Sequence, residues 1–217
     1  MPLQNRVDPF GEIHAVDTRG LFTGNRGVIH DPDSRALLRR RWTTKAWIVC
    51  ALEWCGRRRD VMGRNTPSGR AGSTALFFLD EVTALAAGHR PCFFCRNAAA
   101  RRFARGFAAG QGGGGIAAPT MDAALHRERA ASSGKPLPLW ERPLTDLPEG
   151  AMVADGSAVF ARRGDSLLPW RFAGYNAPLP LREAGARSWR LVTPPSTVAA
   201  LRAGFSPEWH GSADQPA

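Results

Sequence analysis

The sequence lacks long apolar runs, and it contains only four cysteines. Its longest apolar stretches, such as residues 46–52, are far shorter than the roughly 20 residues that a bilayer-spanning helix needs. No apolar segment of the signal-peptide kind stands near the start. These absences argue against a membrane or secreted protein and predict a cytoplasmic one. In a reducing compartment, four cysteines are more typical of thiols or metal ligands than of disulfides.

Several motifs of common protein classes are also missing. The stretch GQGGGG, residues 110–115, lacks the Lys-Ser/Thr ending that a phosphate-binding loop requires. His14, His30, His126 and His210 are scattered, and no pair of them has the spacing of a hydrolytic metal site. Internal repeats and heptads are absent as well. The sequence therefore argues against a phosphate-loop enzyme, a histidine-based metallohydrolase and a repeat protein.

Lysine is scarce, whereas arginine is abundant. Lys45 and Lys135 are the only lysines among the 29 basic residues. The sequence has 19 acidic residues, so the net charge is +10. The excess is concentrated, because residues 35–105 carry 15 basic and 4 acidic residues, whereas residues 136–217 carry 8 of each. Such a field attracts polyanions, and nucleic acid is the commonest one in the cytosol. The sequence thus predicts a DNA partner, with RNA as a second option and a solvated basic face as the alternative.

The patterning in the first half predicts short strands and helices, and hence an α+β fold. Residues 1–34 are typical of turns and short strands, and Ser34 is expected to cap a short helix through Arg41. The stretch 42–54 and the segment TALFFL, residues 74–79, are each expected to contain a strand. Asp80 should cap a helix that ends at Gly88, and a second helix is expected over residues 92–108.

The second half has a different character, rich in proline and balanced in charge. Residues 110–119 are expected to be a glycine-rich linker, and a short helix should follow over 121–131, capped by Thr120. Residues 151–172 hold two turn signals between apolar runs and predict a three-stranded meander. We therefore predict a basic module within residues 1–109, the linker, and a β-rich domain of unknown role over 120–217.

The four cysteines form two pairs with metal-ligand spacing. Cys50 and Cys55 make a C-x4-C pair, and Cys92 and Cys95 make a C-x2-C pair 36 residues further on. A C-x2-C turn that leads into a helix aims both sulfurs at one point, and two such pairs close a tetrahedral zinc site. The alternatives are a redox pair at Cys92 and Cys95, a merely buried Cys50, and His89 as a replacement ligand. We predict zinc bound by all four cysteines.

Two stretches carry a resemblance to a known family. They are LFFLDEVTALAAGHRPCFFCR, residues 76–96, and TTKAWIVCALEWCGRRR, residues 43–59. Residues 43–105 resemble the metal-binding DNA-repair domain of the bacterial adaptive-response protein Ada. In that family an aromatic strand and an Ala-rich helix precede an Arg-Pro-Cys-x-x-Cys motif, and an upstream strand ends in a cysteine. Ala51-Leu52 stands where the family has Arg-Pro, and the first cysteine pair is one residue wider.

The resemblance implies a chemical role for the cysteines. In that family four cysteines hold zinc, and one of them takes a methyl group from a methylated DNA phosphate. By position Cys50 would be this acceptor, with Cys55, Cys92 and Cys95 as the other ligands. A zinc-bound thiolate is a nucleophile at neutral pH, so the implied chemistry is coherent.

Arginines next to the cysteine pairs are the candidate phosphate contacts. If zinc joins the two pairs, their arginines come to lie on one side of the module. The predicted contacts are Arg57, Arg58, Arg59, Arg64, Arg96, Arg101, Arg102 and Arg105. The alternative is that these arginines pair with acidic residues of other segments. Trp54, next to the arginine run, is a candidate for stacking on a base.

These features predict a zinc-dependent protein that binds nucleic acid, with a connection to DNA repair. One alternative is an irreversible methyl acceptor at Cys50. Another is a protein whose zinc only holds the fold and whose partner is a protein or small molecule.

Overall fold

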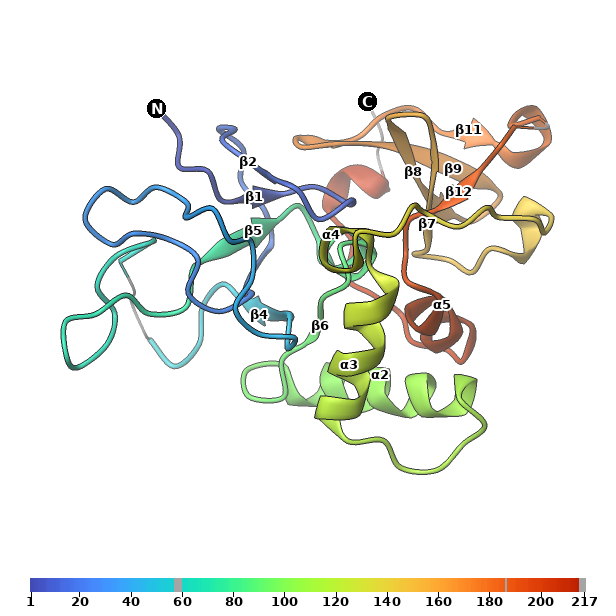
Figure 1. Ribbon diagram of the computed structural model, residues 1–217. Coiled ribbons are helices and arrows are strands. Elements are labelled where there is room, and N and C mark those ends of the chain that lie inside the picture. The colour runs from blue at the N-terminus through green and yellow to red at the C-terminus, as the bar shows by residue number, and fades with distance from the viewer. Residues whose placement is uncertain (57–59, 186, 215–217) are drawn as a thin grey trace.

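The computed structural model describes residues 1–56, 60–185 and 187–214 (Figure 1). In this part of the chain there are two six-stranded sheets and five α-helices, which confirms the predicted α+β class. Among the described residues, none of the helices combines the length and the apolar composition that a transmembrane span requires.

The first sheet belongs to the N-terminal half and has the strand order β2-β1-β5-β3-β4-β6. Its strands are β1 (Arg6–Val7), β2 (Ile13–His14), β3 (Phe22–Asn25), β4 (Ile48–Ala51), β5 (Leu76–Phe78) and β6 (Arg90–Pro91). β4 and β5 lie within the segments predicted as strands, so both expectations are confirmed. β4 pairs with β3 in antiparallel and with β6 in parallel orientation.

The second sheet is built around the predicted meander. Its strands are β7 (Met152–Asp155), β8 (Ala158–Arg163), β9 (Ser166–Arg171), β10 (Gly174–Tyr175), β11 (Leu179–Pro180) and β12 (Arg190–Leu191). β7, β8 and β9 are joined by tight turns in which Gly156 and Gly164 have φ of 59° and 51°. Glycine adopts this left-handed region without strain, so a glycine at each of these positions indicates a tight turn between strands.

Helices from both halves of the chain pack beside the sheets. They are α1 (Glu81–Ala86), α2 (Asn97–Gly110), α3 (Ala118–Glu128), α4 (Ala130–Ser133) and α5 (Pro195–Arg202). Short 3-10 turns are Leu144–Asp146, Leu181–Glu183 and Gly211–Ala213. Asp80 caps α1 as predicted, because its carboxylate accepts the backbone N–H of Thr83 at 2.8 Å.

One predicted helix is wrong, and two others start at a different residue. Residues 34–41 do not form the expected helix. Instead, the Asp31 carboxylate accepts the backbone N–H of Ser34 at 2.8 Å and holds a turn. α2 starts at Asn97 rather than at Cys92, because residues 92–95 form a turn. α3 starts at Ala118, with a proline in its first turn, so Thr120 lies inside the helix.

The glycine-rich stretch expected as a linker connects two helices of one core. Phe103 and Phe107 of α2 share a buried cluster with Met121 and Leu125 of α3 and with residues of β7, β8 and α5. α2 also packs closely on α5, because a side chain at Gly106 would come within 2.8 Å of the α5 backbone. Residues 110–119 therefore do not separate two cores.

Buried ion pairs and hydrogen bonds join the two halves further. Arg90 of β6 and Asp122 of α3 form a bidentate pair at 2.7 and 2.8 Å. The hydroxyl of Tyr175 in β10 donates to the Asp80 carboxylate at 2.8 Å. Burial raises the pKa of that carboxyl. These contacts tie the segments around α1 and β6 to elements from the C-terminal half.

A buried indole lies between two arginines. The guanidinium groups of Arg26 and Arg129 each lie 3.8 Å from the ring centre of Trp47. His89 contacts the same indole and accepts a hydrogen bond from Arg26 at 3.3 Å. Burial, followed by the charge of Arg26, holds the pKa of His89 well below its usual value. His89 is therefore a neutral core residue.

Candidate metal centre

Parallel pairing of β4 with β6 brings the two cysteine pairs together. Ile48 lies opposite Arg90, and Val49 lies opposite Pro91. The backbone N–H of Cys92 donates to the carbonyl of Val49 at 3.0 Å, which continues the pairing by one step. Cys50, inside β4, and Cys92, directly after β6, thus lie at the same end of two neighbouring strands, although 41 residues separate them in the sequence. The sheet, rather than sequence proximity, builds the site.

The C-x2-C segment is a tight turn that leads into α2. The backbone N–H of Arg96 donates to the carbonyl of Cys92 at 3.0 Å, and the helix begins one residue later. The positive end of the helix dipole therefore lies beside Cys95. The geometry is the one that the sequence predicted for this motif, a C-x2-C turn that leads into a helix.

The sulfur atoms of Cys50, Cys92 and Cys95 all lie within 4.8 Å of one another. Around a tetrahedral zinc ion with bonds of about 2.3 Å, two sulfurs are about 3.8 Å apart. The three thiols are free cysteines rather than a disulfide pair. The cluster could therefore hold a metal ion, and thiolates suit soft and borderline ions such as zinc.

Hydrogen bonds within the cluster shift the pKa values of its thiols in opposite directions. A hydrogen bond from Cys50 lowers the pKa of Cys92 to about 5, and the backbone N–H of Phe94 also donates to its sulfur at 3.4 Å. The same hydrogen bond to Cys92 raises the pKa of Cys50, while burial raises that of Cys95. The hydrogen bonds among the thiols thus favour negative charge on the cluster, and a bound cation would displace the remaining thiol protons.

A pocket of about 400 Å³ adjoins the three thiols. All three cysteines line it, and Trp54 and Phe94 lie on its wall with their ring centres 5.9 Å apart. The other lining residues are uncharged: Thr23, Gly24, Asn25, Ile48, Ala51, Leu52, Val61, Ser73, Thr74, Ala75 and Phe77. The candidate centre is therefore reachable from a cavity large enough for a small organic molecule.

The structure does not bring Cys55 into the sulfur cluster. Cys55 is exposed and lies outside the group of three thiols that share one point. Its backbone has a φ of 51°, and the next residue, Gly56, has a φ of 65°. The chain therefore makes a turn at these two residues. His89, the alternative fourth ligand, is also outside the group, because it packs against Trp47 and Phe78.

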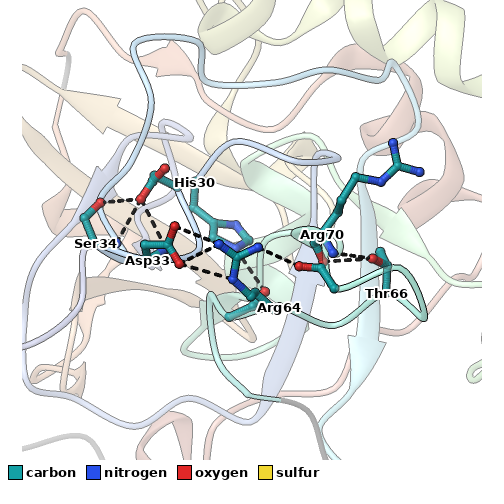
Figure 2. A network of polar contacts seen from close by, with 9 residues as sticks. His30, Asp33, Ser34, Arg64, Thr66 and Arg70 are labelled. Atoms are coloured by element: carbon teal, nitrogen blue, oxygen red, sulfur yellow. Dashed lines mark hydrogen bonds and ion pairs between the residues drawn. The ribbon is translucent and has the colours of Figure 1, made fainter.

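The predicted phosphate contacts lie in different environments. Arg57, Arg58 and Arg59 fall outside the described residues. Arg64 is exposed, but it makes a bidentate pair with Asp33 and donates to the carbonyl of Gly69 (Figure 2). Arg101, Arg102 and Arg105 are exposed on α2, where Arg101 donates to Asn97 at 2.8 Å. These α2 residues keep the position that the prediction gave them.

Arg96 is buried inside the protein and does not lie on its surface. Its side chain is only 6% exposed and pairs with the buried Glu81 and, at 2.6 Å, with Glu208. Its guanidinium also lies 4.3 Å from the ring centre of Phe22. These contacts leave no free face for a phosphate. The sequence pattern placed Arg96 with the other arginines because the helix was expected to start before it.

Sequence reasoning missed the pocket and most of its wall. Thr23 and Asn25 line the pocket from β3, which pairs with β4 so that Thr23 lies opposite Cys50. No local signal marks this pairing. Phe94 is different, because it lies inside the C-x2-C motif itself and is 63% exposed beside the pocket. The doublet Phe93-Phe94 could have indicated a surface next to the thiols.

Comparison with family models, curated proteins and solved structures finds no match to the chain.

Proposed function

We propose that this chain is a zinc-thiolate protein that binds nucleic acid, with DNA as the preferred partner. The meeting of the Cys50, Cys92 and Cys95 sulfurs within 4.8 Å carries the proposal. Zinc is the ion that suits this cluster best, since it is abundant, redox-inert and tetrahedral with thiolate ligands. When bound, zinc would hold β4, β6 and the start of α2 together.

The charge around the cluster supports a polyanionic partner. Arg101, Arg102 and Arg105 lie exposed on α2, which begins two residues after Cys95. None of these three forms an ion pair within the part of the chain that the structure describes. They are therefore available to contact phosphates, which bind through charge without regard to sequence.

Two measurements test the proposal. Purified protein should contain about one zinc ion per chain, and Cys92→Ser should reduce this content. Binding to a DNA duplex should weaken with salt, and changing Arg101, Arg102 and Arg105 to Gln should reduce the salt slope by about 3. A matched variant with Arg142, Arg171 and Arg182 changed to Gln removes the same charge elsewhere and should leave the slope nearly unchanged. Equal effects of both variants would contradict a specific surface.

A second candidate function is methyl acceptance at Cys50. The position of Cys50 on the pocket wall favours it, because an electrophile can approach the sulfur. In this reaction a bond forms between the sulfur and the methyl carbon, the carbon–oxygen bond breaks, and the phosphate leaves as a charged diester. Incubation with methylphosphotriester DNA should then add one methyl group to Cys50, seen by mass spectrometry of its peptide. DNA binding without this mass gain favours simple binding, and no binding at low salt favours a structural zinc protein.

A further inference from the structure

We infer that the metal centre has three thiolate ligands and an open fourth position, which takes a small neutral donor with an apolar body from the adjoining pocket. An imidazole-type nitrogen ligand with an aromatic substituent represents this class. The inference rests on the proposed metal and adds what the centre binds.

The positions of the four cysteines carry the first step. Cys50, Cys92 and Cys95 converge, whereas Cys55 is exposed and outside the group. A tetrahedral ion held by three sulfurs has one remaining position. Because all three cysteines line the pocket, that position is open on the side that protein atoms do not fill. Zinc sites with three protein ligands keep the fourth for an exogenous donor, whereas structural sites are closed by four.

The charge of the site selects a neutral donor. A divalent ion with three thiolates carries one net negative charge, and a fourth thiolate would make this two. No charged side chain is found among the described residues of the pocket wall that could offset the extra charge. A nitrogen donor completes the coordination without adding charge, so it is preferred over an anion.

The shape of the pocket selects an apolar body. Its volume of about 400 Å³ is far larger than one water molecule needs, and it lies within the range of small-molecule sites. Trp54 and Phe94 belong to its wall, where their ring centres lie 5.9 Å apart, and aromatic side chains of this kind pack favourably against apolar groups. Neither a carboxylate nor an imidazole belongs to the described lining, so the wall offers no group for general acid–base chemistry.

Cobalt(II) tests the number of sulfur ligands, because its sulfur-to-metal charge-transfer absorption grows with each bound thiolate. We expect Cys55→Ser to leave this absorption unchanged. Cys95→Ser should reduce it by about a third, as expected for the loss of one of three thiolates. Circular dichroism identifies any variant that fails to fold. Since the Cys55 side chain is exposed, replacing it by serine should disturb folding less than the other replacement.

Ligand titration tests the open position and the pocket together. Imidazole should shift the ligand-field bands of the cobalt protein with saturation, and 4-phenylimidazole should bind about tenfold more tightly because its ring is buried. Trp54→Ala should remove most of this advantage. Trp42→Ala is the matched control, because Trp42 has a similar exposure, 36% against 39%, but lies against His126 outside the pocket.

The outcomes separate this inference from the proposed function. Equal losses of absorption in Cys55→Ser and Cys95→Ser, with no spectral shift on adding imidazole, would show a closed four-cysteine site and overturn the inference while the metal proposal stands. Failure of the intact chain to bind cobalt or zinc would overturn both.

Discussion

Breaking the buried pair between Arg90 and Asp122 should strongly destabilise the protein. Asp122→Asn removes the charge that faces the Arg90 guanidinium, and the two side chains are only 7% and 9% exposed. Removing one member of a buried ion pair leaves the other unpaired in a medium of low polarity. The expected loss is about 3–5 kcal/mol in the free energy of unfolding, measured by urea denaturation.

The double replacement supplies the control for this prediction. Arg90→Met together with Asp122→Leu removes both charges and keeps most of the packed volume, so we expect most of the lost stability to return. Arg90 lies in β6, two residues before Cys92, and its guanidinium lies 5.3 Å from the ring centre of Phe93. Asp122→Asn should therefore also weaken metal binding at the adjacent cysteines. A loss below about 1 kcal/mol would refute the reasoning, because it would match that of an exposed pair.

Three further predictions concern the core and the metal. Since the pKa of His89 is lowered in the folded protein, the unfolded chain binds more protons below about pH 6.5, and stability should fall as the pH drops through that value. His89→Gln should flatten this slope by up to about 1.4 kcal/mol per pH unit in denaturation curves, whereas an unchanged slope would show that His89 does not titrate on unfolding. Tyr175→Phe should cost about 2 kcal/mol, because the buried carboxylate of Asp80 loses a donor, and a change in melting temperature within error would argue against that contact. Removing zinc with a chelator should lower the melting temperature of the intact chain, while Cys92→Ser should already melt at the lower temperature and show no response.

The sequence predicted those parts of the fold whose signals are local. Asp80 as a cap, Gly156 and Gly164 in tight turns, and the β-branched stretch around Ile48 each identify an element from its own residues. The failures have a common cause. Ser34 seemed a helix cap, but the neighbouring Asp31 carboxylate takes the backbone N–H groups and closes a turn instead. Competition between two nearby acceptors depends on geometry that spacing alone does not contain.

The candidate site was also predictable only where its signals are local. The spacing of Cys92 and Cys95 indicates a turn by itself, and the turn is present. That Cys50 rather than Cys55 joins them depends on the parallel pairing of β4 and β6, which is a long-range contact. The buried Arg96 pairs with Glu81, 15 residues away, and with Glu208, 112 residues away. A charge pattern cannot distinguish such an arginine from the exposed ones on α2.

The loop between α2 and α3 has a practical consequence. Gly112, Gly113 and Gly114 have φ near 90°, and no atom lies within 4 Å of the place where a side chain would begin. Both flanking helices are anchored in the shared core, so the chain could be cut or extended here with little strain. A fluorescent protein or an affinity tag inserted between Gly113 and Gly114 would leave both ends of the chain and the cysteine cluster untouched, which makes this loop a suitable handle for finding binding partners in cells.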